Sequence, residues 1–131
     1  MEQPSRIFTI FAISKGKKML ERYEIFRAYV RENFSQTTQE LTDKAIEYAA
    51  ERLAGEVRYD GSPLLDHAVR VAMIAVKEIG LGRNSAVAAI IHDVVRLADK
   101  CKDENLVALL EEIRTLFGEP AVGITVGLAN I

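Results

Sequence analysis

The two histidines of the chain carry its most specific chemistry, and one of them is followed directly by an aspartate. His92 and Asp93 stand in the apolar segment AAIIHDVV, and His67 lies earlier in another apolar stretch. Neutral imidazoles and a carboxylate are suitable ligands for Mn, Fe or Zn, although a fourth protein ligand is usually wanted. The pattern predicts a candidate metal site, and a buried histidine that only satisfies its hydrogen bonds is the alternative.

Helices must position these residues, because apolar side chains recur every three or four positions and strand patterns are almost absent. Helical periodicity covers most of the chain, in the segments 19–34, 41–53, 64–79, 87–97, 106–117 and 121–130. A chain of 131 residues can bury one core but hardly two. The sequence therefore predicts a single all-α domain, a bundle of five to six helices with short loops.

Capping residues predict where several helices begin and end. Side chains suited to N-caps precede three segments: Thr37 with Glu40 as in a capping box, Ser62 before Pro63, and Asn84 or Ser85. Two helices are expected to stop at glycines, Gly80 and Gly118. The turn after Gly80 is short, so the helices on either side should be antiparallel neighbours. That arrangement would bring His67 close to His92.

The composition is that of an ordinary folded domain. It is 49% hydrophobic and 27% charged, and the net charge of −2 gives no bias toward nucleic acid or an anionic membrane. Cys101 is the only cysteine, which excludes an internal disulfide and fits a cytoplasmic location. The apolar run 7–13 is too short to span a bilayer. We interpret it as an N-terminal arm that packs on this domain or on a second copy, which allows a homo-oligomer.

Three blocks of the sequence resemble the RelA/SpoT-type proteins. They are GEVRYDGSPLLDH from Gly55, AAIIHDVV from Ala88, and LEEI from Leu110 with the following FG and residues 122–131. Their order and spacing agree over about residues 41–131. The resemblance implies the HD fold, an α-helical scaffold of metal-dependent phosphohydrolases. Residues 1–36 would then form an arm and helix, and residues 37–131 an HD core truncated at its C-terminal end.

The resemblance also implies a substrate and a set of site residues. In this family the domain removes the 3′-pyrophosphate from the alarmones ppGpp and pppGpp, and a separate domain synthesises them from ATP and GDP or GTP. Three of the four family metal ligands, which hold manganese, are matched by His67, His92 and Asp93. The fourth follows the motif matched by Ile131, so we expect a fragment of a longer protein. Guanine-nucleotide contacts are expected at Arg58, Tyr59 and Asp60.

The chain departs from the family at the two positions after HDVV. Family hydrolases have Glu-Asp there, a pair that orients and deprotonates the attacking water, whereas this chain has Arg96 and Leu97. Arg96 shares a side of the helix with Asp93, so we expect it to pair with this carboxylate and take the place of the cation. Arg96 stays protonated and cannot act as a base. A divalent metal should therefore bind weakly or not at all.

Three functions remain open from the sequence. The first is a degenerate hydrolase domain with a structural or regulatory effect on a synthetase domain of the parent protein. The second is an active metal-dependent ppGpp 3′-pyrophosphohydrolase that uses another base, Asp66 or Asp99. The third is a module that binds guanine nucleotide around Arg58, Tyr59 and Lys100 without turnover.

Overall fold

The structure, a computed structural model, describes residues 17–101 and 105–130 and is built from helices. In chain order they are α2 (Lys17–Asn33), α3 (Gln36–Arg52), α4 (Leu64–Met73), the π-helical segment η1 (Ile74–Ile79), α5 (Arg83–Lys100), α6 (Leu106–Phe117) and α7 (Glu119–Ala129). The described part contains no strand beyond one isolated bridge between Val57 and Pro63. The predicted all-α fold is confirmed. The apolar run 7–13 and Ile131 lie outside the described residues.

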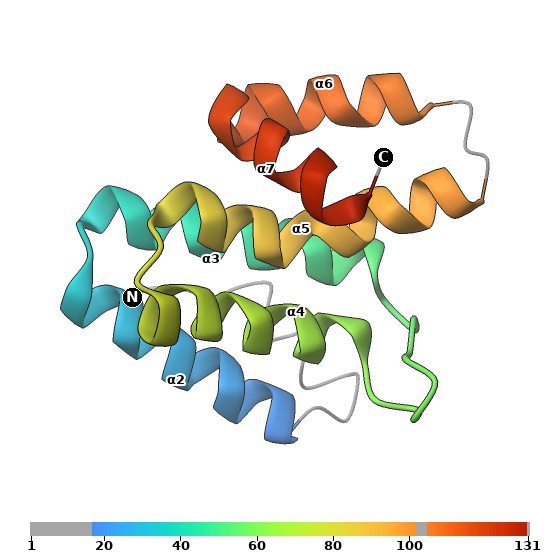
Figure 1. The fold of residues 1–131 in the computed structure, drawn as a ribbon. Helices are drawn as coiled ribbons and strands as arrows, with labels where there is room; N and C mark the ends of the chain where they lie inside the picture. The colour runs from blue at the N-terminus through green and yellow to red at the C-terminus, as the bar shows by residue number, and fades with distance from the viewer. Residues whose placement is uncertain (1–16, 102–104, 131) are drawn as a thin grey trace, which may run out of the picture.

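Helix α5 is the central element of the fold. Its residues 86–95 are all buried, which is typical of a core helix that is apolar on every side. Helices α3, α4, α6 and α7 pack against it, with α6 and α7 above α5 and α4 and α2 below it in Figure 1. Helices α4 and α5 run antiparallel as expected (Figure 1). No helix in the described ranges is long and apolar enough to cross a membrane.

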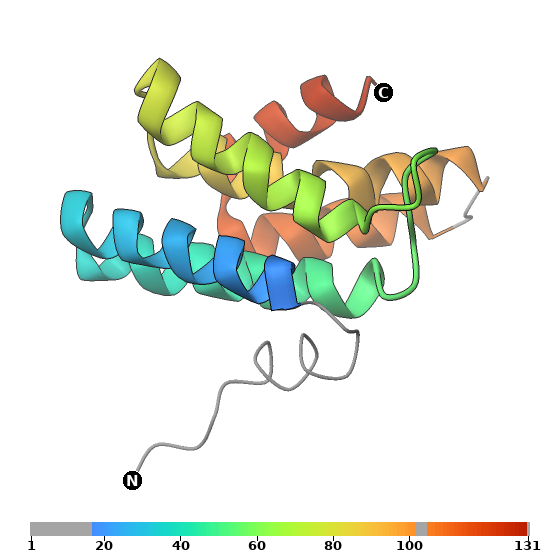
Figure 2. The ribbon, with the colours of Figure 1, turned by 90° about the horizontal axis from the view of Figure 1, so that it is seen from below.

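Helices α2 and α3 form an antiparallel pair, side by side in Figure 2. Helix α2 buries Tyr23, Phe26 and Val30, the face that the apolar spacing predicted. Helix α3 starts after Ser35, whose hydroxyl accepts a 3.1 Å hydrogen bond from the amide of Thr38. The expected cap at Thr37 is therefore wrong. Thr37 already lies inside the first helical turn, so it cannot adopt the extended backbone of a cap.

The caps expected for the next two helices are also wrong, whereas both glycine stops are confirmed. Helix α4 follows Pro63 and α5 follows Gly82, in each case without a side-chain cap. Ser62 is not free to cap α4, because its hydroxyl lies 2.6 Å from the carboxylate of Asp60. Gly80 ends η1 with a left-handed φ of 83°. Gly118 ends α6.

Candidate functional site

His92 and Asp93 lie side by side in the buried middle of α5. The ring atom Nδ1 of His92 is 2.6 Å from the carbonyl oxygen of Ala89. A carbonyl can only accept, so Nδ1 carries the proton and donates it, which leaves Nε2 of the neutral ring as an acceptor. Nε2 lies 3.4 Å from Oδ1 of Asp93. The Asp93 carboxylate is buried, and a buried carboxylate needs a positive charge nearby.

Arg96 supplies that positive charge. Its Nη1 lies 3.3 Å from Oδ1 of Asp93, so the predicted ion pair is confirmed. The Arg96 side chain is 54% exposed and the Asp93 side chain only 4%, which means that the guanidinium covers a buried carboxylate from the surface. Nη2 of Arg96 also donates a 3.2 Å hydrogen bond to the carbonyl of Leu128 on α7. The sequence did not predict this second contact, because it does not reveal which α7 carbonyls face α5.

The second oxygen of Asp93 has no such partner. Oδ2 is buried and accepts no hydrogen bond from the part of the chain that the structure describes. A buried carboxylate oxygen without a partner is costly, and its cost falls when a cation or a polar ligand binds to it. Oδ2 of Asp93 and Nε2 of His92 are thus two acceptor atoms on adjacent residues.

His67 on α4 belongs to the same region. Burial lowers the pKa of His67 below the usual histidine value, and the positive charge of Arg58 lowers it further. The charge of Asp93 raises this pKa and that of His92 lowers it, so α5 lies within electrostatic range of His67. The expected approach of the two histidines is therefore supported. A lowered pKa keeps the imidazole neutral at pH 7, as a metal ligand must be.

These three residues do not make a formed metal site. Within residues 17–101 and 105–130, no group of three or more His, Cys, Asp or Glu side chains is arranged to hold a metal ion. Arg96 already pairs with one oxygen of Asp93. As placed here, the residues do not fit a bound ion, although Oδ2 of Asp93 and Nε2 of His92 keep their lone pairs. The assignment of His67, His92 and Asp93 as metal ligands stays a prediction.

The loop before α4 holds the residues expected to contact a nucleotide. It makes a tight turn in which the Gly61 amide donates to the Arg58 carbonyl, at 2.9 Å, and Gly61 has a φ of 85°. The side chain and amide of Ser62 both donate to Asp60, which holds the pKa of this carboxyl below its usual value. Asp60 thus stabilises the turn. Tyr59 is 95% exposed at the tip, and the Arg58 guanidinium lies 5.5 Å from its ring centre.

The position of Arg58 links this loop to the histidines. Its positive charge lowers the pKa of His67, and the loop that carries Arg58 leads directly into α4, which carries His67. Nucleotide contacts by Arg58, Tyr59 and Asp60 stay a prediction.

Leu97 faces away from this chemistry. It lines a groove of about 310 Å³ between α5 and α6, together with Arg52, Val94, Ala98, Cys101 and Leu109. An aliphatic side chain cannot orient water. The two carboxylates considered as substitute bases differ in their surroundings. Asp66 forms a 2.9 Å ion pair with Arg22 of α2, and Asp99 is exposed near the end of α5.

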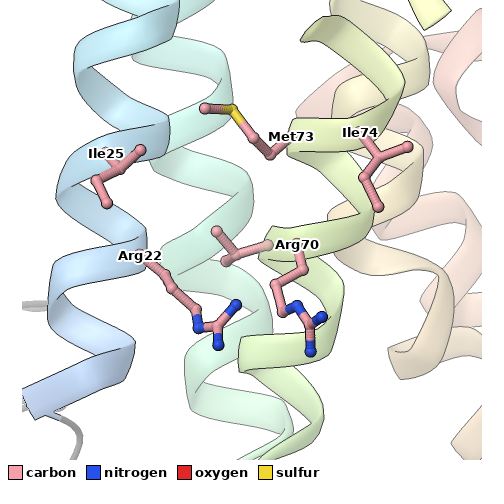
Figure 3. Close-up of a pocket in the computed structure, with 6 residues that line it drawn as sticks. Arg22, Ile25, Arg70, Met73 and Ile74 are labelled. Atoms are coloured by element: carbon pink, nitrogen blue, oxygen red, sulfur yellow. The ribbon is translucent and has the colours of Figure 1, made fainter. Parts of the chain in front are cut away.

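A second groove lies between α2 and α4, on a face that the sequence did not single out. Its volume is about 340 Å³ and its lining is Arg22, Ile25, Val69, Arg70, Met73 and Ile74. Figure 3 shows the two arginine side chains at one end and Ile25, Met73 and Ile74 further along. The lining holds no acid, base or nucleophile for hydrolysis, and the charge of Arg22 is already matched by Asp66. The sequence feature that could have indicated this groove is that Ile25 and Ile74 lie outside the apolar faces of their helices, and both are exposed in the structure.

Comparison with known proteins places the chain in a family. A family model described as an HD domain matches residues 45–131. The match spans 87 of the 131 residues, and it contains the turn before α4, both histidines and Asp93. No curated protein and no solved structure matches the chain significantly. The fold, the buried His-Asp pair and this match agree: the chain belongs to the HD domain family, whose members are modules of the metal-dependent phosphohydrolase type.

Proposed function

We propose that the chain is the HD-type domain of a RelA/SpoT-like alarmone protein and that it has lost hydrolysis. Its role would be structural or regulatory, exerted on an alarmone synthetase domain of the parent protein. The HD family match supports the phosphohydrolase-like scaffold. The narrower assignment rests on the three sequence blocks that begin at Gly55, Ala88 and Leu110.

The ion pair between Arg96 and Asp93 carries the proposal that hydrolysis is lost. In active hydrolases of this type a bound divalent ion lowers the pKa of the attacking water and screens phosphate charge. Here a guanidinium lies 3.3 Å from Oδ1 of Asp93 and gives the carboxylate its counter-charge. It also repels a second cation at the same place.

The missing acid–base pair is a second, independent reason. Arg96 and Leu97 occupy the positions of the Glu-Asp pair, and neither side chain can take a proton from water. General acid–base help is typically worth on the order of 10²–10⁴ in rate. An ion bound weakly at the remaining acceptors would not replace this contribution.

Nucleotide binding without turnover is the second candidate function. The observation that favours it is the loop before α4, which presents an exposed aromatic ring with a guanidinium beside it, in Tyr59 and Arg58. Such a pair can stack on a base and contact a phosphate. The positive charge of Arg58 lowers the pKa of His67. A guanine nucleotide such as ppGpp, bound at this loop, would therefore lie near His67. Binding of this kind is compatible with a regulatory domain.

A double reversal tests the proposal. We expect Arg96→Glu with Leu97→Asp to gain affinity for Mn²⁺ in calorimetry, because the competing charge is removed and two carboxylates are added. Turnover of ppGpp should follow only where a fourth ligand is also supplied. The matched control is Arg83→Glu with Leu81→Asp, the same changes at exposed positions near the start of α5. Equal Mn²⁺ affinity in the two variants would contradict the role given to Arg96.

A further inference from the structure

We infer that Arg96 is a cross-link that couples the His92–Asp93 site to the docking of α7. Its guanidinium contacts Oδ1 of Asp93 on α5 and the carbonyl of Leu128 on α7. The inference rests on the site of the proposed function and deepens it, because it gives the substituted arginine a role of its own. The state of the Asp93 carboxylate and the hydrogen bonding at the C-terminal end of α7 would then depend on the same side chain.

The two contacts use different nitrogen atoms of one planar group. Nη1 lies 3.3 Å from the carboxylate oxygen and Nη2 lies 3.2 Å from the carbonyl oxygen. A guanidinium holds its donors in a fixed fork, so it can bridge two acceptors at once. The ammonium group of a lysine is a compact point charge and lacks this fork. The geometry is therefore specific to an arginine at position 96.

The C-terminal end of α7 needs a partner of this kind. The last carbonyl groups of a helix have no partner within the helix, and the negative end of its dipole favours a nearby cation. Helix α7 has no basic residue in its last turn. Asn130, in a left-handed conformation, donates its amide to Gly127 at 3.2 Å. The Leu128 carbonyl receives its hydrogen bond from Arg96 on the neighbouring helix.

Helix α7 packs with little apolar area, so the hydrogen bond from Arg96 is expected to contribute to holding its C-terminal end on α5. The residues that α7 buries are small or medium in size, namely Ala121, Val122, Thr125 and Ala129. Such side chains allow a close approach to α5 but bury little apolar area at the end of the helix. Two negative groups, the Asp93 carboxylate and the end of α7, meet at Arg96. Without the guanidinium they would face each other with no compensating charge.

The guanidinium therefore compensates the Asp93 carboxylate and the C-terminal end of α7 at the same time. Its loss should leave the Leu128 carbonyl without this hydrogen bond and loosen the last turn of α7.

Hydrogen exchange of the full chain, read by mass spectrometry, tests the cross-link without any assay of activity. In Arg96→Met we expect amides near the end of α7 to exchange roughly two- to tenfold faster, as for the loss of one hydrogen bond. Arg96→Lys should keep much of the wild-type melting temperature, because it keeps the charge, but should still show fast exchange in α7. Arg83→Met, at an exposed arginine in the first turn of α5, is the matched control.

Exchange in α7 that is equally slow in Arg96→Met, Arg96→Lys and the Arg83→Met control would overturn the cross-link. If Arg96→Met fails to fold, the comparison moves to Asp93→Asn with and without Arg96→Met, where no carboxylate charge is left unpaired. Faster exchange in the double variant supports the cross-link, and equal exchange contradicts it. A different result would contradict the proposed function, namely Mn²⁺-dependent turnover of ppGpp by the wild-type chain. That result would leave the exchange comparison intact.

Discussion

At the scale of single residues, Asp93 is the group around which the site is organised. Its Oδ1 has two neighbours, Arg96 at 3.3 Å and His92 Nε2 at 3.4 Å, while Oδ2 is buried with no hydrogen-bond partner in the described chain. A carboxylate buried in this way is tolerated when a cation compensates it. Arg96 is that cation here, and its side chain reaches the buried carboxylate from the surface.

His67 offers a residue-level prediction about where Arg58 lies. Burial, and next the charge of Arg58, lower the pKa of His67 below the usual value of about 6.5. We expect Arg58→Ala to raise this pKa, as measured by an NMR titration of the imidazole. Arg31→Ala, in the last turn of α2, is the control and should leave it unchanged. A His67 pKa that does not respond to Arg58→Ala would remove the support for a nucleotide site at this loop.

The lowered pKa of His67 determines how this residue affects the free energy of unfolding as the pH changes. As the pH falls, His67 of the unfolded chain takes up a proton near pH 6.5, before His67 of the folded chain does. His67 therefore lowers the free energy of unfolding below that pH. The Arg58→Ala change should make this acid-side loss smaller, which urea unfolding at pH 7 and pH 5.5 can measure.

At the scale of helices, the start of α3 separates what local sequence predicts from what the chain adopts. The hydroxyl of Ser35 accepts the Thr38 amide, whereas Thr37 is exposed inside the helix. We expect Ser35→Ala to lower the free energy of unfolding by about 1 kcal/mol, the usual cost of losing an N-cap. Thr37→Ala should change the free energy of unfolding by only a few tenths of the Ser35→Ala effect. Denaturant unfolding would contradict the assignment if Thr37→Ala were the more harmful change.

The positions of the helices were predictable because apolar spacing is a local property of the sequence. Tyr23, Phe26 and Val30 are an example, since their spacing alone defines the buried face of α2. The caps were less predictable, because several residues near a boundary can serve and competing local hydrogen bonds decide among them. Ser62 illustrates this, as Asp60 engages its hydroxyl. The π-helical turn of η1 has no such local signal.

At the scale of the whole molecule, long-range contacts decide what the site can do. The approach of His67 to α5 was predictable, because a short turn forces α4 and α5 to be antiparallel neighbours. The contact between Arg96 and Leu128 was not, since it depends on how α7 lies across α5. The same holds for the hydrogen bond from Tyr48 of α3 to Glu112 of α6, at 2.7 Å. Residues far apart in the sequence complete the site, and periodicity carries no information about them.

The central proposal is that this HD domain has lost metal-dependent hydrolysis and that Arg96 pairs with Asp93 in place of a metal ion. Turnover of ppGpp by the unmodified 131-residue chain, with and without Mn²⁺, tests it most directly. We predict no turnover above the metal-free level, because Arg96 gives Asp93 its counter-charge and neither Arg96 nor Leu97 can take a proton from water. Mn²⁺-dependent release of pyrophosphate that is abolished by His92→Ala would contradict the claim.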